Sequence, residues 1–283
     1  MKELLVISGK GGTGKTTVVG SFAVLARDKV LADADVDAPN LHLLLSPVPV
    51  REQEYQGAKL AITDEDRCTR CGRCQEVCAF GAIEDLRVIA RRCEGCGTCA
   101  LVCPVRAITM QEQITGQVFV SDTRYGMLVH ARLSPGAEAS GRLVTQVIRT
   151  AQAIAAEQQA SIVLVDGSPG IGCPVIASVT GADAVLVVTE PTPSGLHDLT
   201  RVLQVAAHFR VPAGVCVNKW DINEEMAITI EDAGRRFGAT PVGRVPFDES
   251  VVEAVSEGVP VVEFSDGLAA RAIRELWRNL SVQ

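Results

Sequence analysis

Residues 4–17 read LLVISGKGGTGKTT, an apolar run followed by a glycine-rich loop that ends in Lys15 and Thr16. The apolar run predicts a buried strand, and the residues from Thr17 onwards predict a helix. Glycines let backbone N–H groups surround phosphate oxygens, and the N-terminus of the following helix attracts the same negative charge. The GxxxxGKT spacing therefore predicts a phosphate-binding loop, with Lys15 on the β- and γ-phosphates and the Thr16 hydroxyl on Mg²⁺.

The rest of the chain alternates short apolar runs with helical stretches. The predicted strands are Leu4–Ile7, Ile162–Val165, Ala184–Val188 and Ala213–Val217. The predicted helices are Thr17–Arg27, Gly141–Ala156, Leu196–Phe209 and Glu224–Phe237. This alternation predicts an α/β fold with a mostly parallel sheet and with ligands at the carboxyl ends of its strands.

Eight of the ten cysteines form two quartets with the same spacing. The quartets are Cys68-x2-Cys71-x2-Cys74-x3-Cys78 and Cys93-x2-Cys96-x2-Cys99-x3-Cys103. They belong to an internal repeat with a period of 25 residues, in which 68–83 matches 93–108. Zinc also binds paired cysteines, but two complete quartets favour two [4Fe–4S] clusters over zinc.

The cysteine-rich stretch interrupts the strand and helix alternation and predicts an inserted domain. We expect residues 1–58 and 113–283 to form the nucleotide-binding domain and residues 59–112 to form the insertion. Such an insertion closes at modest cost when its two ends lie side by side. After it, Gln117–Val120 and Met127–Leu133 predict an antiparallel hairpin at the edge of the sheet.

Composition limits the classes of partner. The chain of 283 residues has a formal net charge of −7, which argues against a general nucleic-acid-binding surface. The sequence shows neither a secretory signal nor an apolar stretch of membrane-spanning length, so we expect a cytoplasmic protein. Leu268–Leu280 predicts an amphipathic helix, for which packing on the sheet is favoured over peripheral contact with a membrane.

The segment KGGTGKTT, with its additional Lys10, resembles the deviant phosphate loop of the MinD/ParA/nitrogenase-iron-protein superfamily of ATPases. The resemblance implies ATP-dependent association, as a homodimer or with a paralogue, in which Lys10 reaches the partner's nucleotide. It also implies that Asp35 in the first switch orients the attacking water, supported by Asp33 and Asn40. Asp166, in the second switch, would hold an Mg²⁺-bound water.

Asn218, in the segment 218–221 (NKWD), matches the family position that contacts adenine. The same letters satisfy the NKxD pattern that recognises guanine in GTPases, but the Lys10 signature favours ATP. Phe247 lies in a later segment that is expected near the base. The residues expected to bind the nucleotide are Lys10, Gly11, Gly12, Thr13, Gly14, Lys15, Thr16, Thr17 and Asn218.

Residues 60–112 resemble a bacterial two-cluster ferredoxin, in which the fourth cysteine of each run binds the other cluster. The resemblance implies one set of Cys68, Cys71, Cys74 and Cys103 and another of Cys93, Cys96, Cys99 and Cys78. Ala79 stands where the second run has Pro104, which removes no ligand. Of the other two cysteines, Cys216 is expected in the core, and Cys173 is expected to be a structural thiol at a moving loop rather than a ligand.

Taken together, these motifs predict an ATP-hydrolysing dimeric switch that carries two [4Fe–4S] clusters and transfers electrons to a redox partner protein. Two alternatives stay open at this point. One is a carrier or scaffold for iron–sulfur clusters, and the other is a redox-sensing spatial organiser of the MinD kind.

Overall fold

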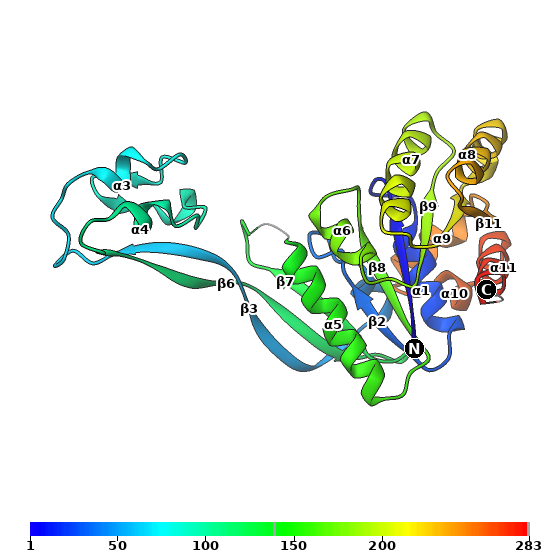
Figure 1. Ribbon diagram of the computed structural model, residues 1–283. Helices are drawn as coiled ribbons and strands as arrows, with labels where there is room; N and C mark the ends of the chain where they lie inside the picture. Colours follow the sequence, from blue (N-terminus) through cyan, green and yellow to red (C-terminus); the bar gives the residue numbers. More distant parts are fainter. Residues whose placement is uncertain (138–139, 282–283) are drawn as a thin grey trace. The chain divides into compact units, whose positions relative to one another are not determined.

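The computed structural model describes residues 1–137 and 140–281, and the chain divides into two compact units (Figure 1). Unit 1 comprises Met1–Gln53 and Val118–Gln283, and unit 2 comprises Glu54–Gln117. Each unit is described by itself below.

Unit 1 is built on a sheet with the strand order β11-β10-β9-β1-β8-β2-β7-β6-β3. Neighbouring strands from β11 to β7 run parallel, which confirms the mostly parallel α/β sheet expected from the sequence. The strands are β1 (Lys2–Ser8), β2 (Lys29–Asp33), β3 (Val48–Thr63), β6 (Ile108–Asp122), β7 (Leu128–Leu133), β8 (Ile162–Pro169), β9 (Ala184–Thr189), β10 (Ala213–Asn218) and β11 (Thr240–Val245).

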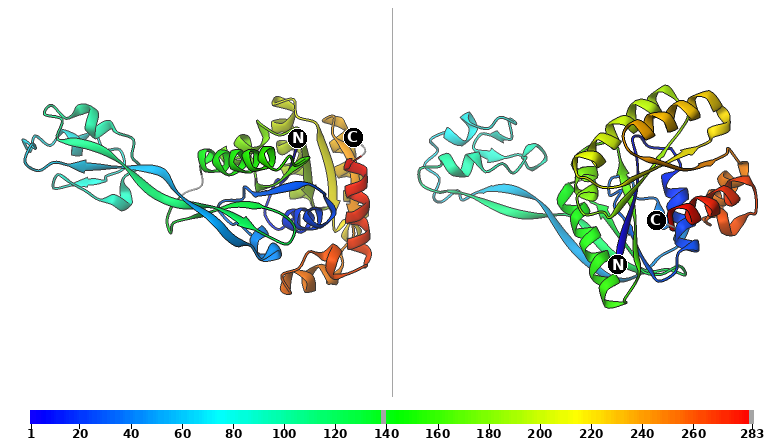
Figure 2. Two further views of the ribbon diagram at one scale, coloured as in Figure 1. Left: turned by 90° about the horizontal axis from the view of Figure 1, so that it is seen from below. Right: turned by 45° about the vertical axis from the view of Figure 1, so that its right-hand side comes forward.

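Helices cover both faces of this sheet (Figure 2). On one face, α2, α10 and α11 each contact α1, and on the other face α5, α6, α7 and α8 contact one another in sequence. The helices are α1 (Lys15–Leu25), α2 (Leu41–Leu45), α5 (Gly141–Glu157), α6 (Cys173–Val179), α7 (Pro193–His208), α8 (Glu224–Arg236), α9 (Glu249–Ser256), α10 (Val261–Phe264) and α11 (Leu268–Ser281). The short 3₁₀ helix Trp220–Ile222 precedes α8.

The apolar side of α11 packs inside unit 1. Ile273 and Leu276 are buried in the same core as Phe22, and the rings of Trp277 and Phe22 lie 4.9 Å apart. Leu268, which the sequence placed on this apolar face, is exposed instead. The stripe is therefore covered by α1 and the sheet, as the favoured interpretation of Leu268–Leu280 expected. None of the described helices combines the length and the apolar character that a membrane span requires.

The predicted hairpin exists, but it does not form the edge of the sheet. β6 and β7 are joined by a tight turn in which Thr123 and Gly126 exchange two backbone hydrogen bonds. β3 lies beyond β6 and forms the edge. The sequence did not predict β3, because most of its side chains are exposed and leave no buried face to detect.

Unit 2 contains two short helices, α3 (Arg73–Glu76) and α4 (Thr98–Val102), that contact each other. It also contains the antiparallel pair β4 (Ile83–Glu84) and β5 (Arg87–Val88) and the 3₁₀ helix Ala90–Arg92. The sequence repeat reappears in the backbone. Gly72 and Gly97 precede α3 and α4 with φ of 76° and 79°, a left-handed conformation that glycine adopts without steric cost.

Candidate functional site

A cavity of about 670 Å³ lies in unit 1 beside the glycine-rich loop. Because the sheet is parallel, the carboxyl ends of β1, β2 and β8 bring the loop and both predicted switch segments to this cavity. Its lining includes the loop residues 11–17, the first-switch residues Asp35, Asp37, Ala38 and Asn40, and the second-switch residues Ser168 and Pro169. Leu43, Leu44 and Val255 supply apolar surface.

The loop has the backbone that an anion site requires. Gly12 and Gly14 have φ of 81° and 89°, and α1 begins at Lys15 without a side-chain cap on its first N–H groups. Uncapped N–H groups at a helix N-terminus favour bound phosphate. The Thr13 hydroxyl is buried, and its oxygen has no hydrogen-bond partner among the described residues.

The ammonium group of Lys15 lies between two carboxylates beside the cavity. Its Nζ atom donates to Asp166 Oδ1 over 2.5 Å and lies 3.5 Å from Asp35 Oδ2. Burial alone would lower the pKa of Lys15, but the carboxylate of Asp166, followed by those of Asp35 and Asp33, outweighs it and raises that pKa. Thr16 Oγ1 donates to Asp166 Oδ2 over 2.8 Å, so Asp166 touches both loop residues that were expected to act on phosphate and Mg²⁺.

The two switch segments are joined by hydrogen bonds beneath the cavity. The Ser168 hydroxyl donates to the Ala34 carbonyl over 2.8 Å, and the Ala34 N–H donates to the Asp166 carbonyl over 2.8 Å. Asp33 is fully buried and accepts from the N–H groups of Asp35 and Leu41. Asp33 thus holds the backbone of the first-switch segment and is not among the residues that line the cavity.

The first-switch carboxylates share a low-dielectric site. Burial raises the pKa of Asp35, and the attraction of Lys15 offsets only part of this effect. Burial also raises the pKa of Asp33 well above its usual value, and the neighbouring Asp166 adds to that rise. A carboxylate with a raised pKa is a better base, and Asp35 is the one that faces the cavity.

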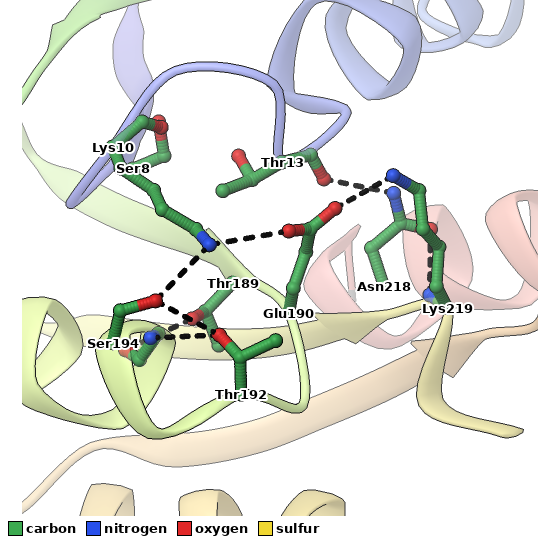
Figure 3. A network of polar contacts seen from close by, with 10 residues as sticks. Ser8, Lys10, Thr13, Thr189, Glu190, Thr192, Ser194, Asn218 and Lys219 are labelled. Carbon is green, nitrogen blue, oxygen red and sulfur yellow. Dashed lines mark hydrogen bonds and ion pairs between the residues drawn. The ribbon is translucent and has the colours of Figure 1, made fainter. Parts of the chain in front are cut away.

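Lys10 and Asn218 lie in a polar network at the end of β9 (Figure 3). Lys10 Nζ is 3.4 Å from Glu190 Oε2 and 3.3 Å from Ser194 Oγ. Asn218 Nδ2 donates to the Thr13 carbonyl over 2.8 Å, so in this structure the amide braces the phosphate loop. Lys219 Nζ donates to Glu190 Oε1 over 2.6 Å.

The aspartate of the NKWD segment makes a contact with the segment that follows β11. Asp221 accepts a hydrogen bond from the backbone N–H of Phe247 over 2.7 Å. That contact joins the two segments that the sequence placed near the base. The Phe247 side chain is exposed.

The eight clustered cysteines line two small cavities in unit 2. One cavity is lined by Cys68, Cys71, Cys74 and Cys103, and the other by Cys78, Cys93, Cys96 and Cys99. Each cavity therefore combines three cysteines of one run with the fourth cysteine of the other run. This is the partition that the ferredoxin resemblance implied.

Backbone N–H groups point at several of these sulfur atoms. Ala82 donates to Cys78 Sγ over 3.3 Å, and Ala107 donates to Cys103 Sγ over 3.2 Å at the equivalent position of the repeat. The Ala107 hydrogen bond lowers the pKa of the Cys103 thiol, whereas burial raises the pKa of Cys99. Among the described residues, no group of three or more histidine, cysteine, aspartate or glutamate side chains is arranged around a position for a single metal ion.

The two remaining cysteines have separate environments. Cys216 is fully buried in β10, and burial raises the pKa of its thiol to about 12, in keeping with a core residue. Cys173 is exposed at the first residue of α6, directly after Gly172, which lines the nucleotide cavity.

Residues 4–261 match the sequence profile of the CobQ/CobB/MinD/ParA nucleotide-binding domain. The chain belongs to this family. It is 30% identical over 281 residues to an uncharacterized protein of Methanocaldococcus jannaschii, with 98% of this chain and 96% of the relative covered. It is 25% identical over 299 residues to the iron–sulfur cluster carrier protein of Pyrococcus abyssi, covering 98% of this chain and 85% of that one. The crystal structure of the cell division ATPase MinD of Pyrococcus furiosus superposes with a TM-score of 0.63 at 20% identity, covering 99% of this chain and 98% of that one.

Family and fold thus identify unit 1 as a MinD/ParA-type ATPase domain. Within it the structure adds residues that the sequence did not single out. Glu190 and Ser194 hold Lys10, and Ser168 ties the second switch to the first. The only sequence signal for Glu190 was its place two residues after the predicted strand Ala184–Val188, at the edge where a parallel sheet collects functional side chains.

Proposed function

We propose that this protein is an ATP-hydrolysing dimeric switch that holds two [4Fe–4S] clusters and couples its nucleotide cycle to electron transfer to a partner protein. The observation that carries the proposal is the presence, on one chain, of a nucleotide-binding domain of the MinD/ParA family and of two cavities that are each lined by four cysteines. The expected division into residues 1–58, 59–112 and 113–283 is part of the proposal.

The residues around the first cavity fit MgATP. Gly11, Gly12 and Gly14 leave backbone N–H groups free to bind phosphate, and the buried Thr13 hydroxyl supplies a polar group without a partner among the described residues. Lys15 would neutralise the β- and γ-phosphates. The remaining loop residues that would bind nucleotide are Lys10, Thr16 and Thr17.

Mg²⁺ and the attacking water have candidate residues at the same place. The Thr16 hydroxyl and the Asp166 carboxylate, already 2.8 Å apart, form an oxygen donor set of the kind that Mg²⁺ prefers. Asp35 faces the cavity with a raised pKa and would accept the proton of the water. Lys10 would neutralise charge on the transferred phosphoryl group of a partner subunit's nucleotide.

Asn218 is proposed to contact the adenine base, because it lies beside the phosphate loop. Its side-chain amide holds the phosphate loop at Thr13, and the same residue would contact adenine. ATP is preferred over GTP because Lys10 belongs to the deviant phosphate loop of the ATPase superfamily.

The residues of unit 2 fit two clusters. Each of its two cavities offers four thiols, the number that a [4Fe–4S] cluster takes, and N–H groups lie against Cys78 and Cys103 to stabilise ligating sulfur. When bound, such clusters supply one-electron oxidation and reduction. The metal ligands would be Cys68, Cys71, Cys74 and Cys103 in one set and Cys93, Cys96, Cys99 and Cys78 in the other, with Thr16 on Mg²⁺.

A carrier of iron–sulfur clusters is the second candidate, favoured by the relative from Pyrococcus abyssi with that name. The two cysteines outside the quartets do not form a pair, because Cys216 is buried and Cys173 is exposed on a different element. A redox-sensing spatial organiser is less favoured, because the apolar face of α11 is packed against α1.

Anaerobic purification tests these functions together. The proposal expects about eight iron and eight sulfide per chain, slow ATP hydrolysis, and a rate that differs between oxidised and reduced protein in the presence of the redox partner. Equal rates in both states would contradict the coupling. Transfer of the clusters to an apo-acceptor during ATP turnover would favour the carrier.

A further inference from the structure

The Lys10 side chain is held by residues of its own subunit (Figure 3). Its Nζ atom lies 3.4 Å from Glu190 Oε2 and 3.3 Å from Ser194 Oγ. The Lys10 side chain is 33% exposed. The Lys10 ammonium is therefore held by two polar contacts on a side chain that is partly exposed to solvent.

Glu190 is shared between two lysines. Its Oε1 atom accepts from Lys219 over 2.6 Å, while its Oε2 atom faces Lys10. The Glu190 side chain is only 16% exposed, and a carboxylate this well covered needs a neighbouring cation. Because Lys219 is the closer of the two lysines, Glu190 keeps a partner when Lys10 moves away. The network thus permits departure of Lys10 without leaving an unpaired carboxylate.

Lys219 also connects Glu190 to the phosphate loop. Its backbone N–H donates to Asn218 Oδ1, and Asn218 Nδ2 donates to the Thr13 carbonyl. Lys219 has a φ of 54°, which a residue other than glycine keeps only where its surroundings hold it. The loop expected to bind phosphate and the carboxylate that holds Lys10 therefore belong to one hydrogen-bonded network.

We propose that Glu190 is a positioning residue that retains Lys10 in its own subunit until MgATP and a second subunit compete for the Lys10 ammonium. The inference rests on the proposed function, in which Lys10 reaches the nucleotide of a partner subunit. A partly exposed ion pair shifts an equilibrium by about two- to fivefold, which restrains association without preventing it. Glu190 thereby sets how tightly two subunits associate at a given nucleotide concentration.

Glu190→Gln tests the retention, because it removes the charge and keeps a side-chain oxygen for Lys219. In nucleotide-free protein, acetylation of Lys10 by acetic anhydride, followed by mass spectrometry relative to Lys2, is expected to become about two- to fivefold faster. With Mg²⁺ and a non-hydrolysable ATP analogue, the dimer dissociation constant measured by sedimentation is expected to fall by about the same factor. Ser194→Ala removes a hydrogen bond from Lys10 to an uncharged hydroxyl, so it should change the acetylation rate and the dimer dissociation constant by a smaller factor.

The Lys10→Met background separates retention from a structural role. There, Glu190→Gln is expected to leave the dimer dissociation constant unchanged. If Glu190→Gln still lowers the dimer dissociation constant in the Lys10→Met background, the inference is overturned. It is also overturned if Glu190→Gln changes neither the acetylation rate of Lys10 nor the dimer dissociation constant while the protein melts like the wild type. Absence of dimers in the wild-type protein would instead overturn the proposed function, and with it the role of Glu190 in association.

Discussion

The two units differ in what holds them together. Unit 1 buries leucine, isoleucine and valine on both faces of its sheet, and the core beneath α1 and α11 joins most of its elements. The buried cluster of unit 2 consists of Ala61, Ile83, Cys99 and Ile108. A core of this size supplies little stability to a segment of this length, and metal binding commonly supplies the remainder. The comparison teaches that unit 1 has an apolar core that can position its site, whereas in the proposed function cluster binding would supply much of the stability of unit 2.

Removal of iron is the strongest way to break this comparison. In protein stripped of iron by oxidation and a chelator, amide hydrogen exchange at residues 54–117 should approach the rates of an unfolded chain. Exchange in the strands of unit 1 should stay slow. Cys173→Ser is the matched control, because this exposed thiol lies outside both quartets and its loss should leave the iron content unchanged. Retained protection of unit 2 without iron would contradict the comparison.

Asp166→Asn addresses the site in unit 1. The substitution removes the carboxylate that touches both Lys15 and Thr16, and we expect steady-state ATP hydrolysis to fall by about 100-fold or more. The iron content of unit 2 should not change. Asp232→Asn, at an exposed carboxylate paired with Arg235, is the control and should retain the rate. Comparable losses in both variants would argue against a specific role for Asp166.

Burial raises the pKa of Glu3 to about 7; the neighbouring Asp183 adds to the rise, and a hydrogen bond from Gln152 opposes it. We therefore expect the free energy of unfolding to depend on the ionisation of Glu3 by about 2–3 kcal/mol. The unfolded chain loses this proton near pH 4.5, so between pH 4.5 and 7 the unfolded state is progressively favoured. Glu3→Gln should therefore raise the free energy of unfolding of unit 1 at pH 8 and change it little at pH 4.5. Denaturant titrations at both pH values measure this effect, and the exposed Glu157→Gln is the control. Equal effects at the two pH values would refute it.

The smallest effect is expected at the surface of unit 2. Lys59 Nζ lies 3.1 Å from Glu112 Oε1, with both side chains about half exposed. Such a pair contributes about 0–1 kcal/mol, so Lys59→Met should barely change hydrogen exchange in iron-loaded unit 2. Lys59→Arg, which keeps the charge, is the comparison variant. A large loss of protection in Lys59→Met alone would mean that surface charge, and not the cysteines, holds this unit.

The sequence predicted those parts of the molecule whose signals are local. Strands such as β9 and β10 are continuous apolar runs, and the phosphate loop is defined by spacing alone. β3 escaped prediction because most of its side chains are exposed, so partner strands determine its conformation. Glu190 escaped for a different reason. Its role depends on contacts with Lys10 and Lys219, which are distant in the sequence. A local sequence pattern cannot predict such long-range contacts.

The same limit applies to the cysteines. Their spacing indicated two sets of ligands, but the exchange of the fourth cysteine came from the resemblance to ferredoxins. In the structure, Cys78 lines the cavity of the second run and Cys103 that of the first. A repeat of identical spacing is compatible with either partition, and the lining of the two cavities supports the exchanged one without testing whether these cysteines bind clusters.

The adjacency of β3 and β6 in the sheet has a practical consequence. The chain departs from unit 1 at Gln53 and returns at Val118 on two neighbouring strands. Unit 2 therefore occupies the place where a simple β-turn would suffice to link the two strands. A chain in which Asn-Gly replaces residues 54–117 would keep only Cys173 and Cys216 of the ten cysteines.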